Sequence, residues 1–292
     1  MIHADYVAPA SLQELLAILH QHGGQAKIIA GGTDLIPQMR LGKLAPKLLI
    51  DPRHLPLLGI AEKEECIHLG ANVTHTQVLA SMLLKKEYSA LVAACQQIGG
   101  PPVRNRGTLA GNLANASPAA DSALPLLVYD AQIVTSRLGG ERVIPLNEFY
   151  LGPGQTQLAE DEFIREIRVP KMPSITKTVF LKLGNRKAMA IAVASVALRL
   201  SLNELGQVIE ARIALGSVAP TPVRAYLAEA IIQSNPLTEE IIKNAAQAAQ
   251  HAASPISDLR ASSGYRSKMV AVLTRRALEM VCQEFASGNS YE

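Results

Sequence analysis

The apolar positions near the start of the chain predict one amphipathic helix and two short strands. Ser11 with Glu14 three residues later has the pattern of a capping box, and Gly23-Gly24 marks the end of the helix. The runs 26–30 and 47–51 are short and apolar, as buried strands are. The residues between the cap and the glycines carry leucine at helical spacing, at Leu12, Leu15, Leu16 and Leu19. Together these elements predict a small α/β unit.

The next part of the chain predicts a second unit that ends near Pro170–Pro173. Thr74 with Gln77 marks a helix start, and residues 88–98 predict a longer helix that stops at Gly99-Gly100-Pro101-Pro102. The run 123–136 is strongly apolar and is expected to be partly strand. Further strands are expected at 66–70, 141–146 and 163–169.

The last third has a different order of elements. Strand-like runs come first and helical segments follow, which is typical of a separate α+β domain. The strands are expected at 178–183, 190–200 and 208–215, and the helices at 224–233, 239–252 and 265–285. The whole chain therefore predicts an α+β protein of more than one domain.

Composition and charge exclude several classes of function. The 292 residues are 48% hydrophobic and 18% charged, with a net charge of +3, no Trp and no basic cluster. Nucleic-acid binding is therefore not expected. The longest apolar run, 188–198, is shorter than the roughly 20 residues of a membrane span, and the first residues do not resemble a secretory signal. We expect a cytoplasmic protein. Cys66, Cys95 and Cys282 lie far apart, so no metal site is expected in this chain.

Ala30-Gly31-Gly32-Thr33-Asp34 follows a predicted buried strand. Adjacent glycines permit a positive φ and let another group approach the backbone closely. The exposed amides and the Thr33 hydroxyl suit a phosphate. The segment contains neither GxGxxG nor GxxxxGK[ST], so by itself an ordinary glycine-rich turn is the better interpretation.

Residues 108–122 consist almost entirely of small side chains. This composition favours a loop whose backbone lies close to a large or extended ligand, with short polar side chains reaching it. The alternative is an alanine-rich packing turn, which would not need the asparagines. The short residues that can form hydrogen bonds with a ligand are Thr108, Gly111, Asn112, Asn115, Ser117 and Asp121.

Taken together, the two segments resemble the flavin-binding signatures of the FAD subunit of molybdenum hydroxylases, the xanthine dehydrogenase and carbon monoxide dehydrogenase family. The similar residues extend over nearly the whole chain: Tyr6 with Pro9, the segment 161–170, Phe180–Lys182, and Tyr265-Arg266. The resemblance implies an α+β fold with a two-subdomain FAD-binding domain of the vanillyl-alcohol oxidase/PCMH type, at 1–54 and 55–173. A C-terminal domain of antiparallel strands and helices, 174–292, is expected to follow.

The resemblance also implies which residues hold the cofactor. The diphosphate would rest on Lys27–Asp34 and on Thr108–Asn112, while Asp121 would hold the ribityl or ribose part. Where the family has a second glycine this chain has Ala110, which must therefore keep an ordinary φ. The implied FAD-binding residues are Lys27, Ile28, Ile29, Ala30, Gly31, Gly32, Thr33, Asp34, Ile98, Thr108, Ala110, Gly111, Asn112, Asp121, Ile164 and Lys182.

Several of these assignments have structural alternatives. Asp34 either contacts FAD or accepts N–H groups of its own turn. Phe163 could replace Ile164 beside the flavin. Arg104 and Arg106 are expected to meet solvent or a local carboxylate, and Thr74 with His75 is expected to cap a helix.

The implied function is an electron relay without a catalytic acid or base in this chain. A molybdopterin cofactor in a large partner subunit would oxidise the substrate, and [2Fe–2S] clusters in a small partner subunit would pass electrons to FAD here. NAD or another acceptor would receive them, in an assembly that could be a dimer of heterotrimers. We expect a xanthine dehydrogenase-like complex; the alternatives are carbon monoxide, aldehyde or N-heterocycle (nicotinate-type) dehydrogenases. A stand-alone flavin oxidase and a non-catalytic nucleotide-binding protein also remain open.

Overall fold

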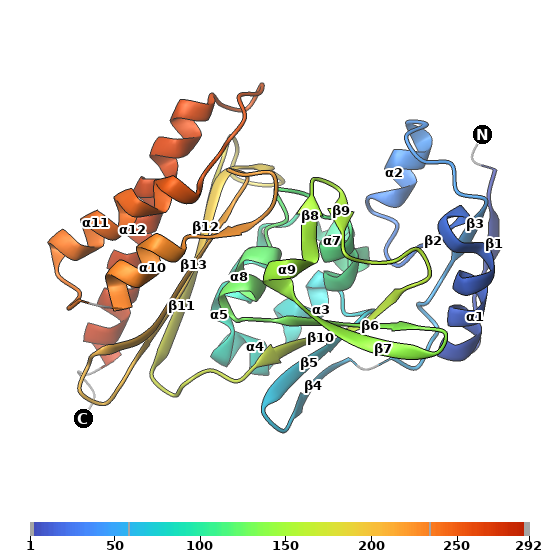
Figure 1. Ribbon diagram of the computed structural model, residues 1–292, viewed down its shortest axis with the longest axis horizontal. Coiled ribbons are helices and arrows are strands. Elements are labelled where there is room, and N and C mark those ends of the chain that lie inside the picture. Colours follow the sequence, from blue (N-terminus) through green and yellow to red (C-terminus); the bar gives the residue numbers. More distant parts are fainter. Residues whose placement is uncertain (1–2, 58, 234, 289–292) are drawn as a thin grey trace.

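The computed structural model describes residues 3–57, 59–233 and 235–288. The chain ends included in the expected ranges, residues 1–2 and 289–292, lie outside this description. Three units follow one another along the sequence, each built around its own sheet (Figure 1). We call them the first lobe, the second lobe and the C-terminal domain, and we keep 1–54, 55–173 and 174–292 as their proposed limits.

The first lobe is a parallel three-stranded sheet with two helices. The strand order is β1-β3-β2, so the predicted α/β unit is present. The Ser11 hydroxyl accepts the Glu14 N–H as predicted, but the Glu14 carboxylate accepts the N–H of Ala10 rather than that of Ser11. The elements are β1 (Asp5–Val7), α1 (Leu12–His22), a 3-10 turn (Gly23–Gln25), β2 (Ala26–Ile28), α2 (Leu35–Arg40) and β3 (Leu48–Ile50).

The second lobe is an antiparallel sheet with short helices packed around it. Its strand order is β4-β5-β10-β6-β7, and β8 and β9 form a separate hairpin. Its strands are β4 (Ile60–Lys63), β5 (Cys66–Gly70), β6 (Gln132–Arg137), β7 (Gly140–Pro145), β8 (Tyr150–Gly152), β9 (Gln155–Thr156) and β10 (Phe163–Pro170). Its helices are α3 (His75–Ala80), α4 (Met82–Glu87), α5 (Ser89–Gln96), α6 (Pro101–Arg106), α7 (Leu109–Ala114), α8 (Ala123–Val128) and α9 (Leu146–Phe149).

Two segments of this lobe differ from the sequence-based expectation. Residues 108–122 are not a continuous loop, because the Thr108 hydroxyl accepts the Gly111 N–H and so caps α7. The apolar run 123–136 is strand only in its second half, and its first half is α8. All six residues of α8 are buried, so no polar face revealed its helical period.

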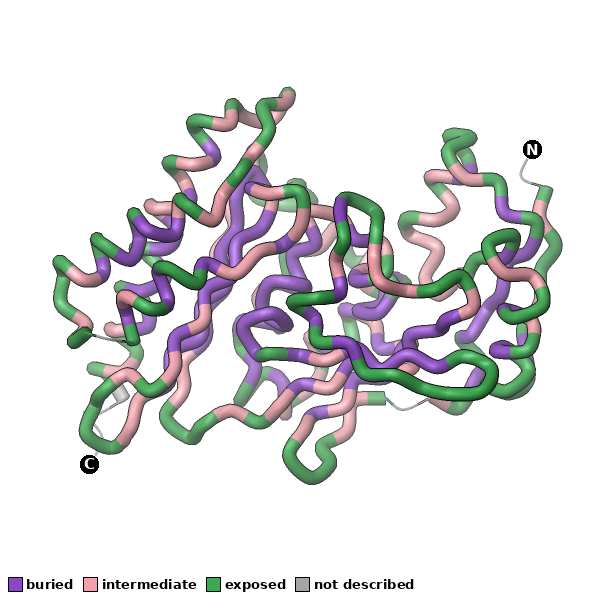
Figure 2. The backbone as a smooth tube through the Cα atoms, viewed as in Figure 1, coloured by how far each residue is buried: buried purple, intermediate pink, exposed green. Residues whose placement is uncertain are grey.

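The C-terminal domain is an antiparallel sheet covered by three helices, as predicted. Strand β12 is buried over most of its length because both of its faces are covered (Figure 2). Val196 and Leu198 pack into the core of this domain, whereas Ala197 packs into the core of the second lobe. The elements are β11 (Thr176–Gly184), β12 (Ala192–Leu202), β13 (Val208–Gly216), β14 (Val223–Arg224), α10 (Tyr226–Gln233), α11 (Glu239–Ala249), a 3-10 turn (Gln250–Ala252) and α12 (Ser263–Gly288).

Two possible features are absent from the described ranges. No helix in them is both long and apolar enough to cross a membrane. Nor do they bring together three or more His, Cys, Asp or Glu side chains as a metal site would require. Cys66, Cys95 and Cys282 are free thiols.

Candidate functional site: a cavity between the two N-terminal lobes

A cavity of about 520 Å³ lies between the first and second lobes. The turn 30–35, the segment 107–115 and the segment 158–164 form much of its wall. Three of the residues expected to bind FAD, namely Ile29, Asp121 and Lys182, are not part of this wall. The wall does contain the others: Lys27, Ile28, Ala30, Gly31, Gly32, Thr33, Asp34, Ile98, Thr108, Ala110, Gly111, Asn112 and Ile164.

The two glycines of the first turn are needed for different reasons. A Cβ added at Gly31 would lie 2.1 Å from the carbonyl oxygen of Arg106, so the turn packs directly against the backbone of the second lobe. Gly32 has a φ of +71°, which disfavours other residues. The close approach predicted for this turn therefore exists, but at Gly31 the approaching group belongs to the chain itself.

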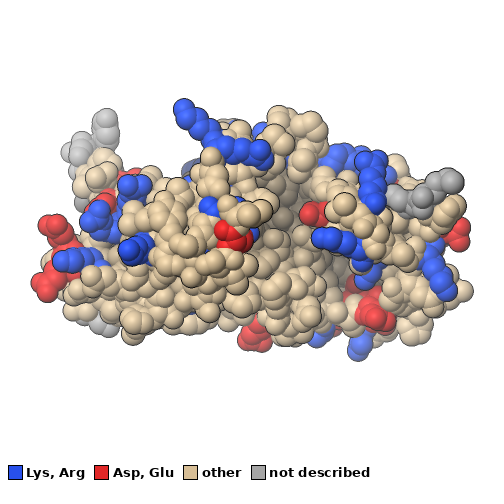
Figure 3. Space-filling view, turned by 90° about the horizontal axis from the view of Figure 1, so that it is seen from above, with Lys and Arg blue, Asp and Glu red and all other residues tan. Residues whose placement is uncertain are grey.

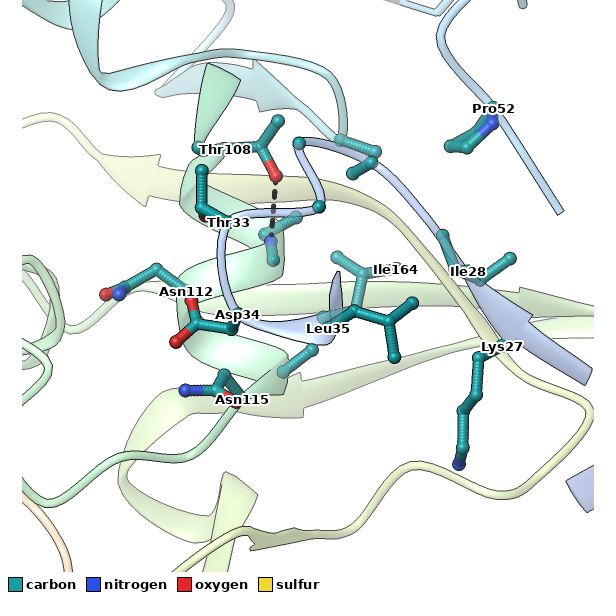
Figure 4. Close-up of a pocket in the computed structure, with 18 of the residues that line it drawn as sticks. Lys27, Ile28, Thr33, Asp34, Leu35, Pro52, Thr108, Asn112, Asn115 and Ile164 are labelled. Atoms are coloured by element: carbon teal, nitrogen blue, oxygen red, sulfur yellow. Dashed lines mark hydrogen bonds between the residues drawn. The ribbon is translucent and has the colours of Figure 1, made fainter. Parts of the chain in front are cut away.

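Asp34 follows these glycines and lies on the same side of the cavity as Asn112 and Asn115 (Figure 4). Its carboxylate makes no hydrogen bond to its own turn, so the alternative that it caps that turn is wrong. Burial raises the pKa of Asp34. The side chain is therefore free to meet a ligand in the cavity.

The second wall is built on the N-terminus of α7. Thr108 forms an isolated bridge with Thr74, and the dashed line in Figure 4 marks the 3.0 Å hydrogen bond from the Gly111 N–H to the Thr108 hydroxyl. A Cβ at Gly111 would lie 2.8 Å from that hydroxyl. Ala110 lies inside the helix, so it has the ordinary φ that its methyl group requires.

Hydrogen bonds that involve side chains also join the two lobes. Gln38 Nε2 donates to Asn115 Oδ1 at 3.3 Å, and the N–H of Gly24 donates to the Glu160 carboxylate at 3.1 Å. Asn115 belongs to the small-residue stretch, whereas nothing in the sequence pattern indicated Gln38. Phe163 and Ile164 both line the wall, so the structure does not require a choice between them.

His75 lines the cavity and was not predicted to do so. Thr74 caps α3 as expected, but His75 is the first residue of that helix and is 2% exposed. Its Nδ1 lies 3.5 Å from Sγ of Cys95, and burial lowers its pKa to about 4. The ring is therefore neutral at pH 7, and the described residues offer its Nε2 no hydrogen-bond partner.

Arg104 also has a role that the sequence did not indicate. Its guanidinium donates to the carbonyl oxygens of Ile98 and Gly99 at 3.1 and 3.0 Å, rather than to solvent or a carboxylate. Gly99 has a φ of +47°, so a sharp turn is held in place here. Arg106 has an exposed side chain, in agreement with the expectation.

Asp121 and Lys182 form a buried pair outside the cavity wall. Nζ of Lys182 donates to Oδ2 of Asp121 at 2.5 Å and to the carbonyl oxygen of Gln97 at 3.1 Å. The two side chains are 6% and 5% exposed, and burial raises the pKa of Asp121 to about 6. Oδ1 of Asp121 is buried and has no hydrogen-bond partner. A buried acceptor of this kind is costly unless a ligand supplies a donor.

Comparison with known proteins identifies the two halves of the chain. Residues 2–172 match the family model described as the FAD binding domain in molybdopterin dehydrogenase. Residues 180–281 match the CO dehydrogenase flavoprotein C-terminal domain. The second match begins near the start of the C-terminal sheet.

Curated relatives align with nearly the whole chain. The carbon monoxide dehydrogenase medium chain of Hydrogenophaga pseudoflava is 34% identical over 276 residues, covering 94% of this chain and 95% of the relative. The xanthine dehydrogenase FAD-binding subunit of Escherichia coli O157:H7 is 32% identical over 278 residues, covering 94% of each.

Solved structures show the same architecture. Carbon monoxide dehydrogenase from Hydrogenophaga pseudoflava superposes with a TM-score of 0.91 at 36% identity, covering 95% of this chain and 96% of that one. Quinoline 2-oxidoreductase from Pseudomonas putida 86 gives a TM-score of 0.89 at 29% identity, covering 96% and 97%. The chain therefore belongs to the family of FAD-binding subunits of the molybdenum hydroxylases.

Proposed function

We propose that this chain binds FAD in the cavity between its two N-terminal lobes and serves as the flavin subunit of a molybdenum hydroxylase. The observation that best supports this proposal is the close contact between Gly31 and the Arg106 backbone. Because of it, the glycine turn and the N-terminus of α7 line the same cavity. Two sets of backbone amides with small side chains beside them suit a diphosphate.

The residues present fit a flavin dinucleotide. Gly32 and Gly111 line the cavity without side chains of their own, and Asp34 and Asn112 are short polar groups on its wall. Oδ1 of Asp121 is a buried acceptor in need of a donor, which a polar edge of the flavin could supply. Lys182 keeps the other oxygen of that carboxylate in place. We propose that this pair lies at the flavin end of the site, beyond Ile98.

Bound FAD would supply the ability to take up electrons singly and release them in pairs. The work of this chain is then binding and orientation. Arg104 fixes the turn at Ile98–Gly99, and Thr108 fixes the start of α7. Glu162 also lines the cavity, but Arg142 binds both of its oxygens at 2.6 Å and its pKa is lowered. That carboxylate is therefore occupied and is a poor general base.

The partners follow from this role. We propose a large subunit with a molybdopterin cofactor and a small subunit with [2Fe–2S] clusters, assembled in the cytoplasm as a dimer of heterotrimers. NAD is the proposed acceptor. Xanthine is the proposed substrate of the complex, and carbon monoxide, aldehydes and N-heterocycles are the alternatives, since relatives at similar identity carry each kind of name.

The test is to purify the chain alone and with its partners and to measure flavin absorbance, metal content and substrate-dependent reduction. The proposal expects one FAD per chain, and molybdenum and iron only in the presence of the partners. Wild-type chain that folds but never retains FAD would refute it. Substrate oxidation by the isolated chain would instead support a stand-alone flavin oxidase.

Two substitutions test the placement of the cofactor. Gly32→Val and Gly111→Val should each abolish FAD binding. The side chain added at residue 32 would crowd Ile29 and Ile36 and resist a positive φ, and the one added at residue 111 would push against the Thr108 hydroxyl that caps α7. Full flavin occupancy in both variants would contradict the proposed site.

A further inference from the structure

A second cavity, of about 390 Å³, also lies where the first and second lobes meet. It shares no lining residue with the cavity proposed for FAD. Leu12 of α1 lies on one side of it, and residues of β4, β5 and β10 lie on the other. Figure 1 shows β4 and β5 at the lower edge of the molecule. Its volume is in the range of small-molecule sites.

One side of the second cavity is aliphatic. Leu12 comes from the first lobe, and the segment 55–57, Leu-Pro-Leu, comes from the connection between the lobes. Leu55 is 5% exposed, and Leu12 and Leu57 pack against the main core. This side is therefore fixed, and it offers a ligand apolar surface without hydrogen-bonding side chains.

The other side is charged because it is the outer face of the sheet of the second lobe. Strand alternation turns the apolar residues of β5 and β10 toward the core and leaves His68, Glu166 and Arg168 on the opposite face. His68 and Arg168 are direct neighbours across these two strands. Arg165, at the bulge of β10, and Lys63, at the end of β4, also line the cavity.

Glu166 is the one acid among the described residues that line this cavity, and it is 2% exposed. Its Oε1 accepts Nε of Arg168 at 2.8 Å and Nη2 of Arg165 at 3.2 Å, and its Oε2 lies 3.2 Å from Nδ1 of His68. Burial alone would raise the pKa of Glu166, but the hydrogen bonds from His68 and Arg168 lower it. The charged carboxylate therefore holds the basic side chains in place around the cavity.

Donors remain free after these bonds are made. Within the described ranges, the two terminal nitrogens of Arg168 have no hydrogen-bond partner, and Lys63 has neither an ion pair nor a hydrogen bond. Arg165 is bound by Glu141 at 2.5 Å as well as by Glu166, so it adds little net charge. The end of a guanidinium group matches a carboxylate through two parallel hydrogen bonds.

The cations of the second cavity are gathered, whereas those on another face of the molecule are not. On the face seen from above in Figure 3, Lys and Arg side chains are spread over both halves of the molecule. Around the second cavity, Lys63, Arg165 and Arg168 surround one small space beside an aliphatic wall. An apolar wall that faces a cationic wall suits a ligand with an apolar body and one anionic end.

We propose that the second cavity binds a small organic carboxylate, with its anionic end on Arg168 and Lys63 and its apolar body against Leu12 and Leu57. No residue of the first cavity takes part, so this proposal does not rest on the proposed function. Because Leu12 belongs to the first lobe and Arg168 to the second, the ligand would contact both lobes.

The test is a calorimetric titration of the full chain, in the presence of excess FAD, with three probes. Naphthoate carries a carboxylate on an apolar body, naphthamide has a similar shape without the charge, and inorganic phosphate has charge without the apolar body. We expect naphthoate to bind at least about tenfold more tightly than either of the other probes. Failure of naphthoate to bind at millimolar concentration would overturn the proposal, as would binding of naphthamide or phosphate that is equally tight.

Lys63→Glu tests where naphthoate binds without disturbing the fold, because Lys63 is exposed and makes no ion pair with a described residue. This variant should bind naphthoate about tenfold more weakly, and the difference from the wild type should shrink as salt is added. Lys243→Glu, at an exposed position on α11, is the matched control and should bind like the wild type. An equal loss in both variants would show an effect of net charge alone and would overturn the proposal.

Arg168→Gln removes the proposed carboxylate-binding group itself. It should weaken naphthoate binding by about tenfold or more, and thermal unfolding shows whether the variant keeps its fold. Unchanged naphthoate binding in Lys63→Glu and in folded Arg168→Gln would refute the proposed site. If Arg168→Gln does not fold, the comparison of Lys63→Glu with Lys243→Glu decides the question.

Discussion

Replacing Gly31 by alanine tests whether the crossing of the two loops builds the cavity. The added Cβ would lie 2.1 Å from the Arg106 carbonyl oxygen and 2.9 Å from the Gly107 nitrogen, whereas ordinary contact begins at 3.4 Å. The two backbones would have to part by roughly 1 Å in a closely packed region. Unlike Gly32, Gly31 has no positive φ, so the effect is one of space alone.

The expected loss of stability follows from proteins in which an extra methyl or methylene group was inserted into a packed region. Such insertions destabilise by about 1–3 kcal/mol. If this destabilisation affects only the closed form of the cavity, FAD should bind about 5- to 150-fold more weakly. If it instead lowers the free energy of unfolding of the whole chain, the midpoint of thermal unfolding should drop by about 2–4 °C for each kcal/mol.

The assay is a titration of the flavin-free chain with FAD, paired with calorimetric unfolding. Gly140→Ala is the matched control, because no atom lies within 4 Å of a Cβ there and its φ is ordinary. The control should match the wild type in both measurements. Unchanged FAD affinity and unchanged stability in Gly31→Ala would refute the claim that this crossing is rigid.

Further predictions concern the groups around the cavity. Thr108→Ala should cost about 1 kcal/mol through loss of the α7 cap and weaken FAD binding several-fold, whereas Thr108→Ser should not; equal flavin affinities would contradict this. Burial lowers the pKa of His75 from 6.5 to about 4, so its contribution is complete above pH 6.5 and is lost as the pH falls through 4. When the free energy of unfolding is measured against pH, His75→Gln should lose about 3 kcal/mol of the pH dependence that the wild type shows. Burial raises the pKa of Asp121 from 3.8 to about 6, so its contribution is complete below pH 3.8 and is lost as the pH rises through 6. The two effects oppose each other in the wild type, and Asp121→Asn should reveal the His75 dependence alone; a pH profile identical to that of the wild type would refute the assignment for Asp121. Lys182→Ala should destabilise the chain by about 3–5 kcal/mol at pH 8 and by less at pH 5, where Asp121 takes up a proton instead; an equal loss at both pH values would argue against the buried pair.

The fold was largely predictable because periodicity and caps are local signals. The leucines of α1 and the cap at Thr74 predicted their helices, and most strands were found. Helix α8 was missed because burial on all sides removes the alternation of polar and apolar residues. Helix α7 was missed because its small residues have a composition typical of loops, and only the Thr108 hydroxyl marks its start.

The sequence predicted those parts of the site at which another group approaches the backbone closely. Glycines and small side chains in two segments indicated close approach, and resemblance to a family linked the two segments. His75 and Arg104 have no comparable signature, because their roles depend on which groups the fold brings near them. The pairing of Asp121 with Lys182 joins residues 61 positions apart, and no local pattern could show it.

The shared packing of β12 bears on how a cofactor could enter. Ala197 and Phe180 belong to the core of the second lobe, so that lobe and the C-terminal domain are held together by continuous apolar packing. The first lobe shares that core too, because Leu15, Leu19 and Ile50 pack into it beside the Gly31 crossing. Moving any one of the three units away would therefore expose core side chains, so we expect a cofactor to enter the cavity while the units stay together. A dinucleotide that touched both lobes would then stabilise an arrangement that already exists, and loading with cofactor should raise the midpoint of thermal unfolding.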